Sequence, residues 1–102
     1  APYNVNLEHR VMVATANIHD HEAELFYVID GGGTMVTGGK LVNPTRPNTE
    51  NQSGTAIEGG TSRKLVKGDF IMVPEGVAHW VSAIDGSLTM MSLHLPRATA
   101  AK

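Results

Sequence analysis

Short runs of apolar residues, rich in Val and Ile, recur along the chain and are separated by Gly, Pro and Asp. The apolar positions show no helical period of useful length, and such runs between turn residues are typical of β-strands. Turn sequences such as Asp30-Gly31-Gly32-Gly33 and Asp85-Gly86 support this interpretation. The pattern predicts an all-β sandwich, jelly roll or small barrel, with strands over residues 10–18, 24–29, 34–37, 63–66, 69–73, 79–83 and 87–95.

One segment, residues 38–64, interrupts this pattern because it is rich in Gly, Thr, Asn and Pro. Its only apolar pairs are Leu41-Val42 and Ala56-Ile57. We expect a long loop here, which is either a surface insertion or a lid over a site. Residues 97–102 follow Pro96 and have little to bury, so we expect a loose tail.

Length and composition limit the classes of function. The chain has 102 residues, which is one domain over 1–102, and its net charge is −2. No basic stripe is present to bind nucleic acid or an acidic membrane, and no apolar run is long enough to cross a bilayer. The absence of Cys excludes disulfides and Cys-type zinc sites. We expect a soluble protein, exported if a signal peptide preceded Ala1 and cytoplasmic otherwise.

The candidate chemistry begins with the sequence His19-Asp20-His21-Glu22-Ala23-Glu24. Alternate residues of a strand share a face, so His19 and His21, if extended, point the same way as Asn17, and Glu24 points the same way as Phe26. If that face is the barrel interior, an unpaired Glu24 carboxylate is costly, and a cation held by Glu24 and imidazoles removes the cost. Such His and carboxylate sets bind Fe, Mn, Zn or Ni. The alternative is a His-x-His pair in a solvated turn.

A second sequence string strengthens the metal hypothesis. It is Gly68-x5-Pro74-x-Gly76-x2-His79. This string resembles the second motif of the cupin superfamily, Gly-x5-Pro-x-Gly-x2-His-x3-Asn, at every position except the last, where Ala83 replaces Asn. The spacing from Glu24 to Gly31 is that of the end of the first cupin motif. The resemblance covers residues 10–95, which is nearly the whole chain.

The first cupin motif, Gly-x5-His-x-His-x3–4-Glu-x6-Gly, is matched less closely. Its leading Gly is Val at position 11 or 13, depending on the register. If His19 and His21 are its two histidines, the spacing from His21 to Glu24 is one residue short. If Asn17 and His19 take the two positions, the spacing fits, but Asn replaces the first His. The resemblance therefore implies one of two metal-ligand sets: His19, His21, Glu24 and His79, or Asn17, His19, Glu24 and His79. Imidazole binds divalent metals more strongly than an amide oxygen, which favours the first set.

The resemblance also implies a fold and a function. We expect a cupin jelly-roll barrel of two antiparallel sheets that holds a divalent transition metal (Fe, Mn, Zn or Ni) near one end and forms a homodimer. The implied function is a small-molecule enzyme, an oxygenase ahead of an isomerase or lyase. The alternative is a non-catalytic cupin module that binds a sugar or another small ligand.

Two further groups of residues are candidates for the chemistry. His94 shares a strand face with Met90 and Ser92, so we expect it to line the cavity as a catalytic acid or base, with a half-buried structural His as the alternative. Three basic residues would meet an anionic substrate if the segment 38–64 folded over the cavity mouth: Arg46, Arg63 and Lys64. Otherwise they are solubilising surface charges.

Overall fold

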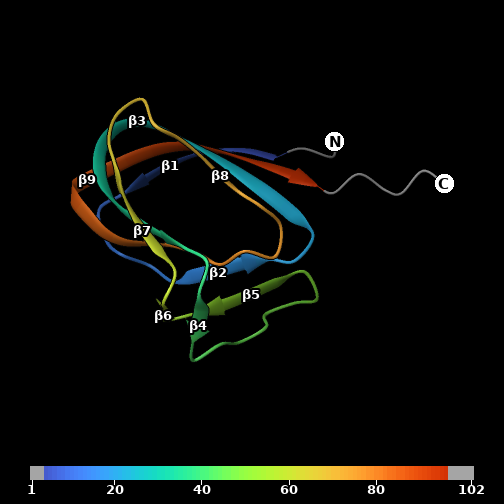
Figure 1. Cartoon of the computed structure of the whole chain (residues 1–102). Helices are drawn as coiled ribbons and strands as arrows, with labels where there is room; N and C mark the ends of the chain where they lie inside the picture. Colours follow the sequence, from blue (N-terminus) through green and yellow to red (C-terminus); the bar gives the residue numbers. More distant parts are fainter. Residues whose placement is uncertain (1–3, 97–102) are drawn as a thin grey trace.

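The structure is a computed structural model that describes residues 4–96, and these residues form nine strands and no helix (Figure 1). Nothing in this range has the length and hydropathy of a membrane-crossing helix. The expected all-β fold is confirmed. The strands are β1 (Asn4–Arg10), β2 (Ala16–His19), β3 (Glu22–Thr37), β4 (Lys40–Val42), β5 (Asn51–Gly54), β6 (Ala56–Glu58), β7 (Thr61–Leu65), β8 (Phe70–Val73) and β9 (His79–Pro96).

The two longest strands, β3 and β9, pair antiparallel along their lengths and run through both layers of the barrel. Layer A has the strand order β1-β9-β3-β8, and layer B has the order β5-β2-β9-β3-β7. The pairing shifts register at three places between Val28 and Met35, where the strands bend from one layer into the other. Gly31 lies at this bend with a φ of 78°, and a Cβ there would be 2.0 Å from the Ser87 carbonyl oxygen. The two antiparallel layers are those of a jelly roll, as expected (Figure 1).

The interior between the layers is filled by alternate residues of the strands. Phe26 and Val28 of β3 are buried, as are Leu88 and Met90 of β9. Burial of such side chains is the main favourable contribution to folding. The cluster also includes Met35, Leu65, Ile71, Val73 and Val81.

The segment 38–64 is not a single loop, because β4, β5, β6 and most of β7 lie within it. β5 pairs with β2 at the edge of layer B, and β4 pairs with β6. Ile57 and Leu41 of the two-stranded β4–β6 sheet pack against Ala16, Val36 and Ala78 on the outer face of layer B. The two apolar pairs that the sequence showed in this segment therefore bury a second, smaller core. No such pairing could be recognised from these three- and four-residue strands.

Other predicted boundaries also need correction. Residues 10–18 are not one strand, because β1 ends at Arg10 and β2 begins at Ala16. The predicted strands 24–29 and 34–37 are parts of one continuous strand, β3. Likewise, the predicted strands 79–83 and 87–95 are parts of β9, and each long strand passes through its glycines. The glycines make bends within strands where the sequence suggested separate turns. The expected loose tail at 97–102 lies outside the described residues.

The outer face of layer A carries two cross-strand rows of apolar side chains. Within residues 4–96, no strand pair packs over these rows as β4 and β6 do over layer B. The register places these residues side by side across β1, β9, β3 and β8. Leu7 is 73% exposed and Phe70 is 60% exposed. We call this surface the apolar face: Val5, Leu93, Leu25 and Met72 form one row, and Leu7, Met91, Tyr27 and Phe70 form the other.

Candidate metal centre

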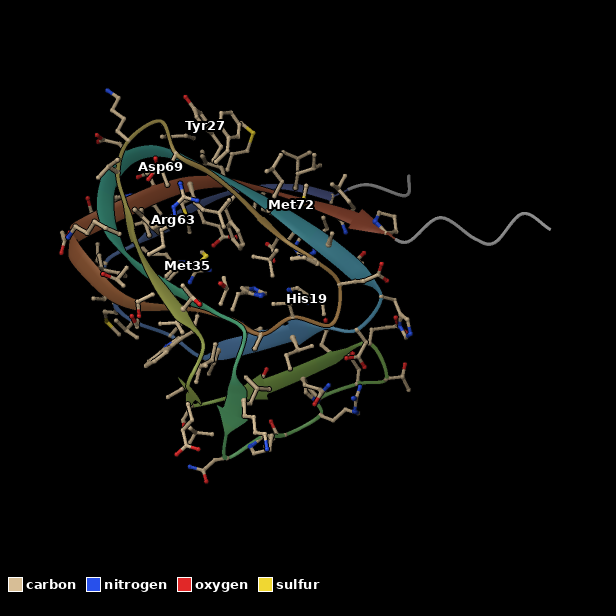
Figure 2. The ribbon with its side chains drawn as sticks, in the orientation of Figure 1. His19, Tyr27, Met35, Arg63, Asp69 and Met72 are labelled. Carbon is tan, nitrogen blue, oxygen red and sulfur yellow. The ribbon has the colours of Figure 1, made fainter. Side chains whose placement is uncertain are left out.

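Four polar side chains from three strands meet inside the barrel. Glu24 of β3 lies directly opposite His94 of β9 in the strand register. Asn17 of β2 lies opposite His79 at the other end of β9, so His19, two residues along β2, points into the same space. Figure 2 shows His19 within the ring of strands. The bending of β9 over the barrel thus brings both of its histidines to one acidic side chain.

The three imidazoles approach the Glu24 carboxylate through the same ring atom. The Nε2 atoms of His19 and His79 are 3.2 and 3.3 Å from Glu24 Oε1, and His94 Nε2 is 3.1 Å from Oε2. The Glu24 side chain is only 5% exposed. The rings also lie close together, with centroids 5.2 Å apart for His19 and His79 and 5.0 Å apart for His19 and His94.

The opposite ring nitrogens of two of these histidines are held by hydrogen-bond acceptors. Asn51 Oδ1 is 2.6 Å from His19 Nδ1, and Glu22 Oε1 is 3.1 Å from His94 Nδ1. An amide oxygen and a carboxylate only accept hydrogen bonds, so each Nδ1 carries a proton and donates a hydrogen bond. The Nε2 of the neutral ring then carries a lone pair that faces Glu24. This arrangement fixes the tautomer and the ring orientation that metal-binding histidines use.

The pKa values of Glu24 and His19 are both shifted by their surroundings. Burial raises the pKa of Glu24, but contacts with His19 and His79 and the charge of His94 outweigh it, so the pKa lies well below its usual value. In return, the contact with Glu24 raises the pKa of His19 above its usual 6.5, although burial acts in the opposite direction. Glu24 is therefore ionised at neutral pH and attracts positive charge to this point.

The donor set fits a divalent transition metal. Glu24 Oε1 is buried without a hydrogen-bond partner, which is costly for a polar atom in a barrel interior. One ligand atom each from His19, Glu24 and His94 lie within 4.8 Å of one another. Imidazole nitrogens and a carboxylate oxygen suit Fe, Mn, Zn and Ni. A cation between these atoms would satisfy the unpaired carboxylate oxygen and the lone pairs that face it.

The structure places two of the sequence candidates away from these atoms. His21 is in the turn after β2, where its half-exposed ring contacts Glu50 at 2.7 Å. Asn17 is on the same strand as His19, but its Oδ1 accepts a hydrogen bond from the Ser53 hydroxyl at 2.9 Å. His19, Glu24 and His79, common to both ligand sets, lie together, and His94 joins them in place of His21.

Sequence reasoning missed the two residues that hold the imidazoles. Glu22 is two residues before Glu24 on β3, and this alternate spacing was a signal that both carboxylates share a face. Asn51 gave no such signal, because it lies in the segment expected to be a loop and reaches His19 only through the pairing of β5 with β2.

A cavity of about 230 Å³ lies beside the cluster. Its lining comes from β3, β7 and β8 and includes Thr37 and Ile71. Thr37 is the cross-strand partner of His79, and Ile71 is the partner of Phe26, whose ring centroid is 5.6 Å from that of His79. The barrel thus has space for a small molecule next to the candidate ligands.

The fold and the cluster define a class of protein, a small β-barrel with a His and Glu site suited to a divalent metal. The cupin family model matches residues 3–96. The chain therefore belongs to the cupin family, which confirms the resemblance seen in the sequence motifs. Comparisons with curated proteins and with solved structures found no match.

Proposed function

We propose that this cupin binds one divalent metal ion through His19, Glu24, His79 and His94 and uses it in a reaction of a small organic molecule. The proposal rests on the convergence of three Nε2 atoms on one buried carboxylate, at 3.1–3.3 Å. His94, expected from the sequence as an acid or base, becomes a ligand because its Nε2 points at Glu24 and Glu22 holds its Nδ1.

Each residue of the centre has a defined task. Glu24 offsets one positive charge of the ion, and Asn51 and Glu22 keep the imidazoles of His19 and His94 turned towards it. Bound there, Fe, Mn, Zn or Ni would supply a Lewis acid, and Fe or Mn would also supply a redox centre. We favour an oxygenase over an isomerase or lyase, because His and carboxylate donor sets with open coordination positions are those of non-haem iron oxygenases.

Metal analysis of protein purified without an affinity tag tests this proposal. We expect about one equivalent of metal in the wild type, loss on chelation, and recovery when Fe, Mn, Zn or Ni is added. Glu24→Gln and His79→Ala should each weaken metal binding at least tenfold. His21→Ala is the matched control and should bind as the wild type does, since His21 contacts Glu50 at the surface.

Two results would overturn the assignment. The first is a wild-type protein that binds none of these metals at micromolar concentration. The second is a loss of binding in His21→Ala as large as that in His79→Ala, which would return His21 to the ligand set.

We also propose that a second copy of the chain covers the apolar face. Its two rows contain no charged side chain, so the matching surface must also be apolar. A copy related by a two-fold axis presents the same rows, as closed dimers do. The Tyr27 and Phe70 rings stack with centroids 4.5 Å apart, which gives the β3–β8 end of this face a rigid aromatic pair.

The oligomeric state tests the dimer. Sedimentation of the wild type should give a dimer, and Leu7→Glu should give a monomer that keeps its fold. Met12→Glu introduces the same charge at a residue that is 74% exposed but outside the apolar face, and it should remain dimeric. A wild type that sediments as a monomer at tens of micromolar would refute this interface.

A further inference from the structure

An arginine lies on the inner face of the barrel at strand β7. Arg63 is directly opposite the buried Met35 in the register of β3 and β7, and Thr61 is opposite Thr37. Directly paired residues share a face of the sheet, so Arg63 is on the interior side and its neighbour Lys64 is on the outer side. The Arg63 side chain is 51% exposed, so its guanidinium lies at the open end of this face, where a ligand from solvent can reach it.

The guanidinium of Arg63 is only weakly engaged by the protein. Its Nη1 donates to the Phe70 carbonyl at 3.4 Å, and its Nη2 is 3.7 Å from Asp69 Oδ1. The other oxygen of Asp69 accepts the Val66 backbone N–H at 2.9 Å, which holds that carboxylate in the β7–β8 turn. A guanidinium has five N–H donors, so most of its hydrogen-bonding capacity is left for a ligand.

Arg63 lines the cavity of about 230 Å³ described above. Arg63 is its one charged lining residue within the described part of the chain, and two hydroxyls and three apolar side chains complete the wall. Pockets for drug-sized ligands measure about 300–1,000 Å³, so this one fits a smaller molecule. The six lining residues are Met35, Thr37, Thr61, Arg63, Ile71 and Met72.

Two residues of the cavity wall link it to neighbours of the metal centre. Thr37, in its wall, is paired with His79, and Ile71 is paired with Phe26, which packs against His79. In Figure 2, Arg63 and Met35 are labelled towards one side of the ring of strands and His19 towards the other. A molecule held by Arg63 would extend past Met35 and Ile71 towards the candidate ligands.

We propose that this cavity binds a small organic carboxylate, which is the substrate class of the metal centre. The carboxylate pairs with Arg63 through two parallel N–H···O bonds, as guanidinium–carboxylate pairs commonly do. The short apolar body packs on Met35 and Ile71, and the opposite end of the molecule faces His79. The assignment of this ligand as substrate rests on the proposed function, whereas its binding at Arg63 does not.

Binding to metal-free protein tests the proposal without relying on the metal. Hexanoate is the probe, and hexanamide, with the same shape and no charge, is its neutral match. We expect hexanoate to bind the wild type with millimolar or tighter affinity and hexanamide at least tenfold more weakly. Arg63→Gln should lose at least tenfold of the hexanoate affinity. Lys64→Gln removes one positive charge from the next residue, whose partner is Asp85, and should bind hexanoate as the wild type does.

The outcomes separate this proposal from the metal assignment. Equal binding of hexanoate and hexanamide, or equal losses in Arg63→Gln and Lys64→Gln, would overturn it even if the protein binds metal. Inorganic phosphate that competes as well as hexanoate would also overturn it, because the site would then recognise a bare anion. Failure of the proposed function looks different: no metal binds, while hexanoate still distinguishes Arg63→Gln from the wild type. Arg63→Gln should keep its metal content and its thermal unfolding midpoint within a few degrees of the wild type.

Discussion

Removal of the Glu22 carboxylate should weaken metal binding although Glu22 is not a proposed ligand. Its Oε1 accepts a hydrogen bond from His94 Nδ1 at 3.1 Å, and the other ring nitrogen of His94 is 3.1 Å from Glu24. Without Glu22, the His94 ring can rotate and can place its proton on Nε2, where it competes with a metal ion. A metal ion would also lose the support that a hydrogen-bonded carboxylate gives to a ligating imidazole.

The magnitude follows from the exposure of the contact. Loss of such a supporting hydrogen bond typically weakens metal binding by 10–100-fold. The Glu22 side chain is 34% exposed, so water screens its charge and partly replaces its hydrogen bond. We therefore expect the lower end of this range for Glu22→Ala, about tenfold or ~1.4 kcal/mol. Glu22→Gln keeps an oxygen acceptor without the charge and should lose less.

Competition between the protein and a chromophoric chelator for zinc measures these affinities at a fixed pH. Glu50→Ala is the control, because it removes a carboxylate from the ring of His21 at 2.7 Å, outside the cluster. Zinc affinities that are equal in Glu22→Ala and the wild type would refute the role of Glu22. Equal losses in the Glu22 and Glu50 variants would show a general charge effect.

Three further results are expected. Because Glu24 raises the pKa of His19, the protonated ring stabilises the metal-free fold below pH 6.5, and this contribution is lost as pH rises through the raised pKa. The thermal unfolding midpoint of metal-free protein should therefore fall over this pH range, and a midpoint that does not change with pH would contradict the prediction. Metal at a free concentration of 100 times Kd stabilises the native state by ~2.7 kcal/mol, so chelation should lower the thermal unfolding midpoint by roughly 10–20 °C. An unchanged midpoint would mean that no metal binds the native state. Gly31→Ala should lower the free energy of unfolding in urea by more than Gly76→Ala, because a Cβ at Gly31 meets the Ser87 carbonyl oxygen. For Gly76→Ala the positive φ alone predicts about 1–2 kcal/mol, and equal losses in the two variants would show that the bend at Gly31 is placed incorrectly.

The sequence predicts the fold class and the buried faces of the long strands, because alternation and turn residues are local signals. Phe26 and Val28, expected to face inward with Glu24, do so. The sequence could not predict that β3 and β9 are continuous. A glycine such as Gly31 or Gly86 is equally compatible with a bend inside one strand and with a hairpin turn between two strands. Short strands such as β5 also escape prediction, because their pairing with β2 depends on residues about 35 positions away in the chain.

The metal centre shows the same division between local and long-range information. The cupin motifs point to His19, Glu24 and His79, but which further side chain lies beside them depends on the register of β3 with β9, which places His94 directly opposite Glu24. A shift of that register by one residue would turn His94 to the apolar face and leave Glu24 with two imidazoles. The bulges between Val28 and Met35 change the register along the same two strands, so they also determine that Thr37 meets His79 at the other end of β9. The position of the cavity relative to the ligands is therefore a consequence of strand pairing, which no motif encodes.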